Sequence, residues 1–96
     1  MRPIFIGDEA TASGYRLAGL DARTPAMTEI RDALHEALEA EPPLILVTME
    51  YARQLEADER ARLFARVSPP ILPVADAGGR VPAGDLAAWI RAGILT

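Results

Sequence analysis

The residues of this chain that could do chemistry are acids and hydroxyls that follow short apolar runs. Asp8 and Glu9 follow the first run, Thr48 to Glu50 follow a later one, and Asp76 follows the last. In an α/β protein with a parallel sheet, such residues meet at the carboxyl edge of the sheet, where ligands of this fold class bind. Carboxylate and hydroxyl oxygens suit a hard cation such as Mg²⁺. The first chemistry to consider is therefore a magnesium site for phosphoryl transfer.

A phosphoryl-transfer site of the response-regulator receiver type is incomplete in this sequence. Such a site needs an acceptor aspartate at the end of the third strand and a lysine further on. The third strand here ends in Thr48-Met49-Glu50, and the chain contains no lysine. We therefore expect Asp8 to be a helix N-cap, because its carboxylate can accept the unpaired N–H groups of the first turn. Glu9 should favour the positive end of the same helix.

Other catalytic and binding patterns are also incomplete. Gly7 and Gly14 are too far apart for a dinucleotide-binding turn, and Gly78-Gly79 is expected to be a flexible turn. His35 is the only histidine and has no cysteine or second histidine with which to share a metal. Ser13 has no histidine base near it in the sequence. We predict no catalytic residue, no metal site and no bound cofactor, and hence a protein that is not an enzyme by itself.

Alternating strand and helix signals indicate how these residues are positioned. Ile4–Ile6 should be a strand, followed by a helix from about Glu9 to Ala18. Gly19 should end this helix, where a left-handed residue is favoured. We expect the small face of the helix to press against the sheet, with Gly14 present to allow close approach. That face comprises Ala10, Thr11, Gly14, Leu17 and Ala18.

The rest of the chain continues this alternation. The expected elements are a weak edge strand over Leu20–Arg23, a helix from Thr24-Pro25 to about Ala40, a buried strand over Leu44–Val47, two helical pieces within 48–66, an edge strand over Ile71–Val74 and a final helix capped by Asp85. The second helix should bury Met27, Ile30, Leu34, Ala37 and Leu38, and Leu63, Phe64 and Val67 should support the later helical piece. Arg60, Arg62 and Arg66 should form a solvated face. The predicted fold is one α/β, flavodoxin- or receiver-like three-layer domain over residues 1–96, with a four-stranded parallel sheet of order 2-1-3-4 and helices on both faces.

Composition limits the kinds of partner. The chain has 96 residues, a formal net charge of −4 and no cysteine, so disulfides and thiolate chemistry are excluded. The negative charge argues against nucleic acid, which needs a concentrated basic face. No apolar run approaches the ~20 residues of a membrane span, and the first residues do not have the form of a signal peptide. We expect a cytoplasmic protein with no direct membrane insertion.

The N-terminal stretch resembles the F subunit of the V-type and archaeal-type ATPases and ATP synthases. The resemblance rests on Gly7-Asp8, on Thr11 and on the run Gly14-Tyr-Arg-Leu-Ala-Gly-Leu20. It continues in register through Leu44-Ile-Leu-Val-Thr-Met-Glu50 and Pro70-Ile-Leu-Pro-Val74. The resemblance implies a receiver-like domain without receiver chemistry. It further implies a protein that docks on the coiled-coil D protein of the central stalk, which rotates within the catalytic hexamer and couples ATP turnover to proton or sodium transport through the membrane ring.

The family often carries a longer, charged C-terminal helix, whereas this sequence ends in a short and rather apolar one. For contact with the partner we single out Tyr15 and Arg16, expected on the exposed side of the first helix, and Trp89 and Arg91 in the last helix. Two alternatives to a stalk protein remain open at this stage. One is a stand-alone receiver-like ligand-binding or signalling module without phosphotransfer chemistry, and the other is a catalytically inactive relative that serves another assembly.

Overall fold

The polypeptide forms a four-stranded parallel sheet with helices packed against it. The computed structural model describes residues 1–77. Its elements are β1 (Ile4–Ile6), α1 (Glu9–Leu17), β2 (Asp21–Arg23), the 3₁₀ turn η1 (Met27–Glu29), α2 (Ile30–Glu39), β3 (Ile45–Thr48), α3 (Met49–Ala52), α4 (Ala57–Phe64) and β4 (Ile71–Val74). The final helix expected after Asp85 lies outside the described residues.

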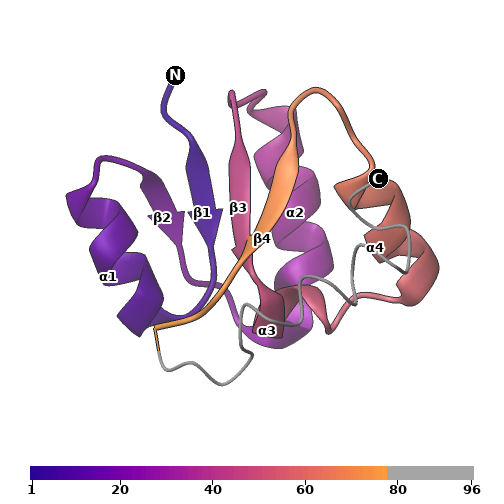
Figure 1. Cartoon of the computed structure of the whole chain (residues 1–96), viewed down its shortest axis with the longest axis horizontal. Helices are drawn as coiled ribbons and strands as arrows, with labels where there is room; N and C mark the ends of the chain where they lie inside the picture. The colour runs from indigo at the N-terminus through magenta and orange to yellow at the C-terminus, as the bar shows by residue number, and fades with distance from the viewer. Residues whose placement is uncertain (78–96) are drawn as a thin grey trace.

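The sheet has the predicted strand order, β2-β1-β3-β4, and every neighbouring pair is parallel. Ile4 lies opposite Ile45, which in turn lies opposite Ile71. The two short outer strands flank the buried central strands, and Figure 1 shows α1 beside β2 and α4 toward the β4 side of the sheet. Pro73 lies in the edge strand β4, where a missing N–H is tolerated.

The side chains of β1 show that helices cover both faces of the sheet. Ile4 and Ile6 belong to the main core cluster, together with residues of α2 and α4 such as Leu34 and Leu63. Phe5 lies between them in the strand and therefore points to the opposite face. There its ring stacks on Tyr15 of α1, with 4.6 Å between ring centroids. The three layers expected from the sequence are thus present.

Of the five residues on the predicted buried face of helix α1, the structure buries only Thr11. Ala12 is fully buried and Thr11 nearly so, whereas Ala10, Gly14, Leu17 and Ala18 are exposed. Leu17 has a relative exposure of 89%. The prediction that Gly14 allows close approach to the sheet is wrong, because a Cβ built on Gly14 meets no atom of residues 1–77 within 4 Å. The aromatic stack of Tyr15 on Phe5 sets the orientation of the helix, and this orientation leaves Leu17 facing outward.

Two other details differ from the prediction. Helix α2 begins at Ile30 rather than at Thr24-Pro25, because residues before it remain extended and then form the turn η1. The Pro25 carbonyl accepts a hydrogen bond of 2.7 Å from the Tyr51 hydroxyl, which holds this segment away from a helical path. Val67 does not support α4, since it is 88% exposed.

The described part of the chain contains no helix long and apolar enough to cross a membrane.

Candidate functional site

A ligand of this fold class would bind at the carboxyl edge of the sheet. The polar side chains at this edge form hydrogen bonds and other interactions with neighbouring groups of the protein. The Asp8 carboxylate accepts hydrogen bonds from the Thr11 backbone N–H at 3.1 Å and from the Thr11 hydroxyl at 2.8 Å. The same hydroxyl accepts a bond of 2.7 Å from the Ala77 N–H. Asp8 is therefore the N-cap predicted from the sequence. Thr11 also joins the start of α1 to the chain that follows β4, a contact that the sequence does not reveal.

The second polar cluster at this edge is also engaged. Thr48 is fully buried and caps α3, since its hydroxyl accepts a bond of 3.3 Å from the Tyr51 N–H. Asp76 is only 6% exposed, and both Asp76 and Glu50 interact with neighbouring groups. Within residues 1–77, no three histidine, cysteine or acidic side chains come together in a way that could hold a metal ion.

The turn after β1 is closely packed at Gly7. A Cβ placed on Gly7 would lie 2.6 Å from both the Phe5 ring and the Thr48 methyl group, and both of those side chains are fully buried. Position 7 requires glycine because the backbone passes there between the side chains of Phe5 in β1 and Thr48 in β3. The next residues, Asp8 and Glu9, are acidic and would repel a phosphate at this helix end.

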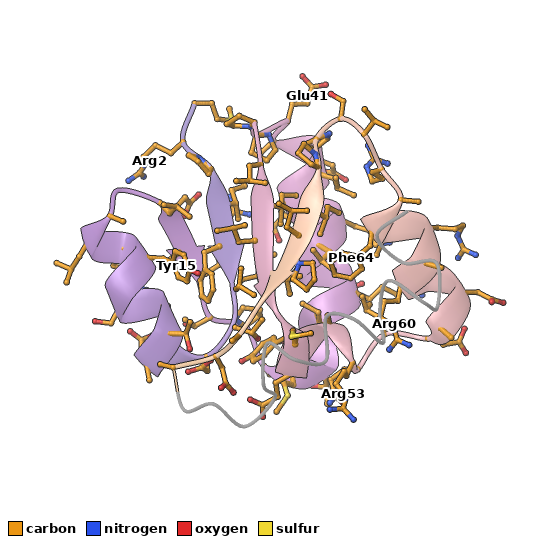
Figure 2. The ribbon with its side chains drawn as sticks, viewed as in Figure 1. Arg2, Tyr15, Glu41, Arg53, Arg60 and Phe64 are labelled. Atoms are coloured by element: carbon orange, nitrogen blue, oxygen red, sulfur yellow. The ribbon has the colours of Figure 1, made fainter. Side chains whose placement is uncertain are left out.

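Arg16 lies on the exposed side of α1, as predicted, but its position is partly fixed. Its guanidinium pairs with Glu9 at 3.0 Å and donates to the Ala22 carbonyl of β2 at 3.4 Å. The second contact covers an outward-facing group of the sheet edge. Tyr15 was expected beside it on the exposed side and is instead half-buried in its stack on Phe5 (Figure 2). Trp89 and Arg91, the other predicted contacts, lie outside the described residues.

The remaining residues with reactive side chains have ordinary surroundings. Ser13 is exposed on α1. The His35 Nε2 lies 3.9 Å from a Glu59 carboxylate oxygen, and the imidazole is about half exposed. Arg62 and Arg66 are exposed as predicted, whereas Arg60 is half-buried and interacts with neighbouring groups, so its assignment to a solvated face is wrong.

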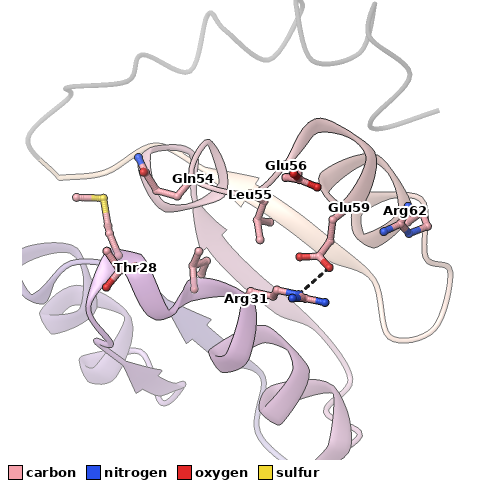
Figure 3. Close-up of a pocket in the computed structure, with 9 residues that line it drawn as sticks. Thr28, Arg31, Gln54, Leu55, Glu56, Glu59 and Arg62 are labelled. Carbon is pink, nitrogen blue, oxygen red and sulfur yellow. Dashed lines mark hydrogen bonds and ion pairs between the residues drawn. The ribbon is translucent and has the colours of Figure 1, made fainter.

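A groove between η1, the start of α2 and the segment from α3 to α4 was not predicted from the sequence. Its volume is about 460 Å³, within the usual range of binding clefts. The Arg31 Nε and the Glu59 carboxylate span it with an ion pair of 3.0 Å (Figure 3). The groove is lined by Met27, Thr28, Ile30, Arg31, Gln54, Leu55, Glu56, Glu59 and Arg62. No motif could have revealed it, because its two walls are separated by more than twenty residues of sequence.

The fold and this edge together define a class of protein: a small doubly wound α/β chain in which side chains of the protein itself occupy the usual ligand edge. A comparison with family models then identifies the family. The model of the ATP synthase (F/14-kDa) subunit matches residues 4–88. This chain belongs to that family, the F subunit of V/A-type ATP synthases. No curated protein matches the chain at a significant level.

Proposed function

We propose that this protein is a non-catalytic rotor component of a V/A-type ATPase or ATP synthase and that it docks on the coiled-coil protein of the central stalk. The observation that carries the proposal is the family match over residues 4–88. Through the stalk the protein would help couple ATP turnover in the catalytic hexamer to proton or sodium movement through the membrane ring. It would thus be located at the membrane through the complex, on the cytoplasmic side, without insertion of its own.

The chemistry at the carboxyl edge supports a role in binding over one in catalysis. Asp8 and Thr48, which could have served as ligands, cap helices α1 and α3. Gly7 is enclosed by buried side chains. A protein that passes torque needs a rigid body and a firm contact, and these caps and close contacts contribute rigidity.

Co-expression with the coiled-coil stalk protein of the same complex tests the proposal. We expect the two chains to elute together in gel filtration, with a mass by light scattering that equals one copy of each. The purified chain alone should not hydrolyse ATP. Separate elution of the two chains at micromolar concentrations would overturn the proposal, as would ATP hydrolysis by this chain alone.

Arg16, Tyr15, Trp89 and Arg91 stay as predicted contacts within this proposal. Arg16 is the one that can be tested most directly, because its side chain is half exposed. Arg16→Glu would remove the pair with Glu9 and reverse the charge of the exposed side of α1. If α1 faces the stalk, this variant should bind the coiled coil less tightly than the parent chain.

A further inference from the structure

We infer that the groove between α2 and α4 receives an amphipathic helix of the coiled-coil partner, with an apolar side chain of that helix in the groove and charged side chains opposite Glu56 and Arg62. The inference rests on the proposed function, which supplies the partner, and it names the surface that the partner occupies. Four features of the groove carry it: an apolar floor, walls joined by side-chain contacts, rim charges of both signs and the spacing of those charges.

The floor of the groove is apolar. Ile30 is 3% exposed and Leu55 is 6% exposed, and the half-buried Met27 lies beside them. An apolar side chain placed on this floor would lose contact with water at a favourable ~25 cal/mol per Å² of buried area. The groove thus offers a place for one bulky apolar side chain, in the manner of a knob that packs into a hole between helices.

Two side-chain contacts already join the walls of the groove when no partner is bound. The Glu59 side chain is 15% exposed and pairs at 3.0 Å with Arg31 of α2, whose own side chain is 70% exposed. His35, one turn further along α2, lies 3.9 Å from the same carboxylate oxygen. These contacts connect α2 to α4 across the groove, so that a partner would meet a surface that is already formed, which lowers the entropy cost of binding.

The rim carries charge of both signs. Glu56 and Arg62 line the groove, are exposed, and form no ion pair with any other residue in 1–77. A nucleotide or another polyanion would be attracted by Arg62 but repelled by Glu56 and Glu59. A segment of protein that carries both a basic and an acidic side chain can pair with Glu56 and Arg62 at the same time.

The spacing of the rim charges suits a helix. Glu56 is the N-cap of α4 and Arg62 lies six residues later, so their backbones are separated by about 9 Å along the axis. A facing helix spans that distance with about six residues, close to one heptad. Coiled-coil helices place apolar side chains at a and d, with charged side chains flanking them at e and g. The proposed stalk partner is a protein of this kind.

Charge reversal at the rim tests the inference in the complex of the full chain with the coiled-coil protein. We expect Arg62→Glu and Glu56→Arg each to raise the dissociation constant by about tenfold or more, because a like charge then faces the partner at each end. Arg2→Glu and Glu36→Arg are matched controls. They make the same changes of charge at exposed positions outside the groove, and they should bind within about twofold of the parent chain at about 0.15 M salt, where remote charges are screened. Thermal unfolding of each variant alone confirms that it is folded.

The outcomes separate this inference from the function on which it rests. If the parent chain does not bind the coiled coil, the proposed function fails. If the parent chain binds and the groove variants bind equally well, only the groove assignment fails. Loss of binding in Arg16→Glu, with the groove variants unaffected, would move the contact to α1 and overturn the inference.

A photo-crosslinking residue at Gln54, which is exposed on the rim, identifies the occupant directly. We expect crosslinks to the coiled-coil protein from position 54 and none from position 2, which is exposed and lies outside the groove. Crosslinks from position 54 only to a second copy of this chain, or only to residues 78–96 of the same chain, would each overturn the inference.

Discussion

Two glycines near the start of the chain have opposite surroundings, and the close approach predicted for Gly14 occurs at Gly7 instead. Gly7 lies between Phe5 and Thr48, and an added Cβ would come within 2.6 Å of both side chains. Gly14 is exposed in the middle of α1, and no atom of the described part of the chain lies within 4 Å of an added Cβ. Helix α1 therefore contains a glycine that packing does not require, and the close approach occurs in the turn before it.

The first prediction compares alanine at these two positions. Gly7→Ala should lower the free energy of unfolding by about 1–3 kcal/mol, because the neighbouring side chains are fully buried and cannot move aside easily. Gly14→Ala should raise it by about 1 kcal/mol, since alanine is the better helix former at an exposed position. Urea unfolding followed by circular dichroism measures both. Equal effects of the two substitutions would contradict the packing described for Gly7.

A second prediction concerns the cap of α1. Asp8→Ala removes the acceptor of two hydrogen bonds from Thr11 and should cost about 1 kcal/mol of stability, the usual effect of losing an N-cap. Asp8→Asn is the control, because its amide oxygen can still accept the Thr11 N–H, and it should lose markedly less. Urea unfolding again gives both values. If the asparagine variant were as unstable as the alanine variant, the charge of Asp8 would matter more than its capping geometry.

At the scale of elements, the start of α2 is decided by a contact that is distant in sequence. Thr24-Pro25 has the residue types of a helix start, yet the helix begins at Ile30. The hydroxyl of Tyr51, in α3, donates a hydrogen bond to the carbonyl of Pro25, in the segment between β2 and η1. Local capping preferences are worth about 1 kcal/mol, which a tertiary contact of similar strength can offset.

This contact leads to a third prediction. Tyr51→Phe should lower stability by about 1 kcal/mol, the typical net value of one hydrogen bond, while the ring remains in the core. Amide hydrogen exchange should become faster in residues 24–29, because that segment loses its anchor. Exchange in the central strand β1 serves as the internal reference. Uniform acceleration in both segments would indicate general destabilisation instead of a local anchor.

The elements that were predicted correctly are those whose signal is local. The continuous apolar run before Thr48 and the capping and terminating residues of α1, Asp8 and Gly19, determined the positions of these elements from residue types alone. Gly19 has a φ of +99°, and the bonds from the Gly19 N–H to Arg16 and from the Leu20 N–H to Tyr15 close the helix. The strand order also followed, because a flavodoxin-like order with right-handed crossovers places the two weak strands at the edges of the sheet.

What was missed depends on contacts between separate elements. The face of α1 was predicted from small side chains, but the stack of Tyr15 on Phe5 determines how the helix is rotated. The groove between α2 and α4 could not be predicted from the sequence. Ile30 and Leu55 line it together only because the chain passes from α2 through β3 and returns to the same face of the sheet. Residue types indicate which side chains can be buried. The packing of the elements then determines which neighbours each buried side chain contacts.

At the scale of the whole molecule, the polar residues hold separate segments together. The hydroxyl of Thr11 joins α1 to the chain after β4, Tyr51 joins α3 to the segment before α2, and Arg31 joins α2 to α4. Each of these contacts links two segments that are far apart in sequence. A body held in this way resists shear between its layers, as the proposed role on a rotating shaft requires.

The last prediction follows from binding equilibria. If the folded chain binds the coiled-coil protein and the unfolded chain does not, the partner stabilises the folded form by RT ln(1 + [L]/Kd), about 2.7 kcal/mol at a free concentration of about one hundred times Kd. For a chain of this size, each kcal/mol raises the melting temperature by roughly 4–8 °C. We therefore expect the unfolding transition of this chain to rise by about 10 °C or more, the product of these two values, and to shift further with each tenfold increase in partner. Differential scanning fluorimetry of a singly labelled chain follows this transition without interference from the partner, and a coiled coil of unrelated sequence serves as the control. A melting temperature that does not depend on the concentration of the stalk protein would show that the two proteins form no specific complex.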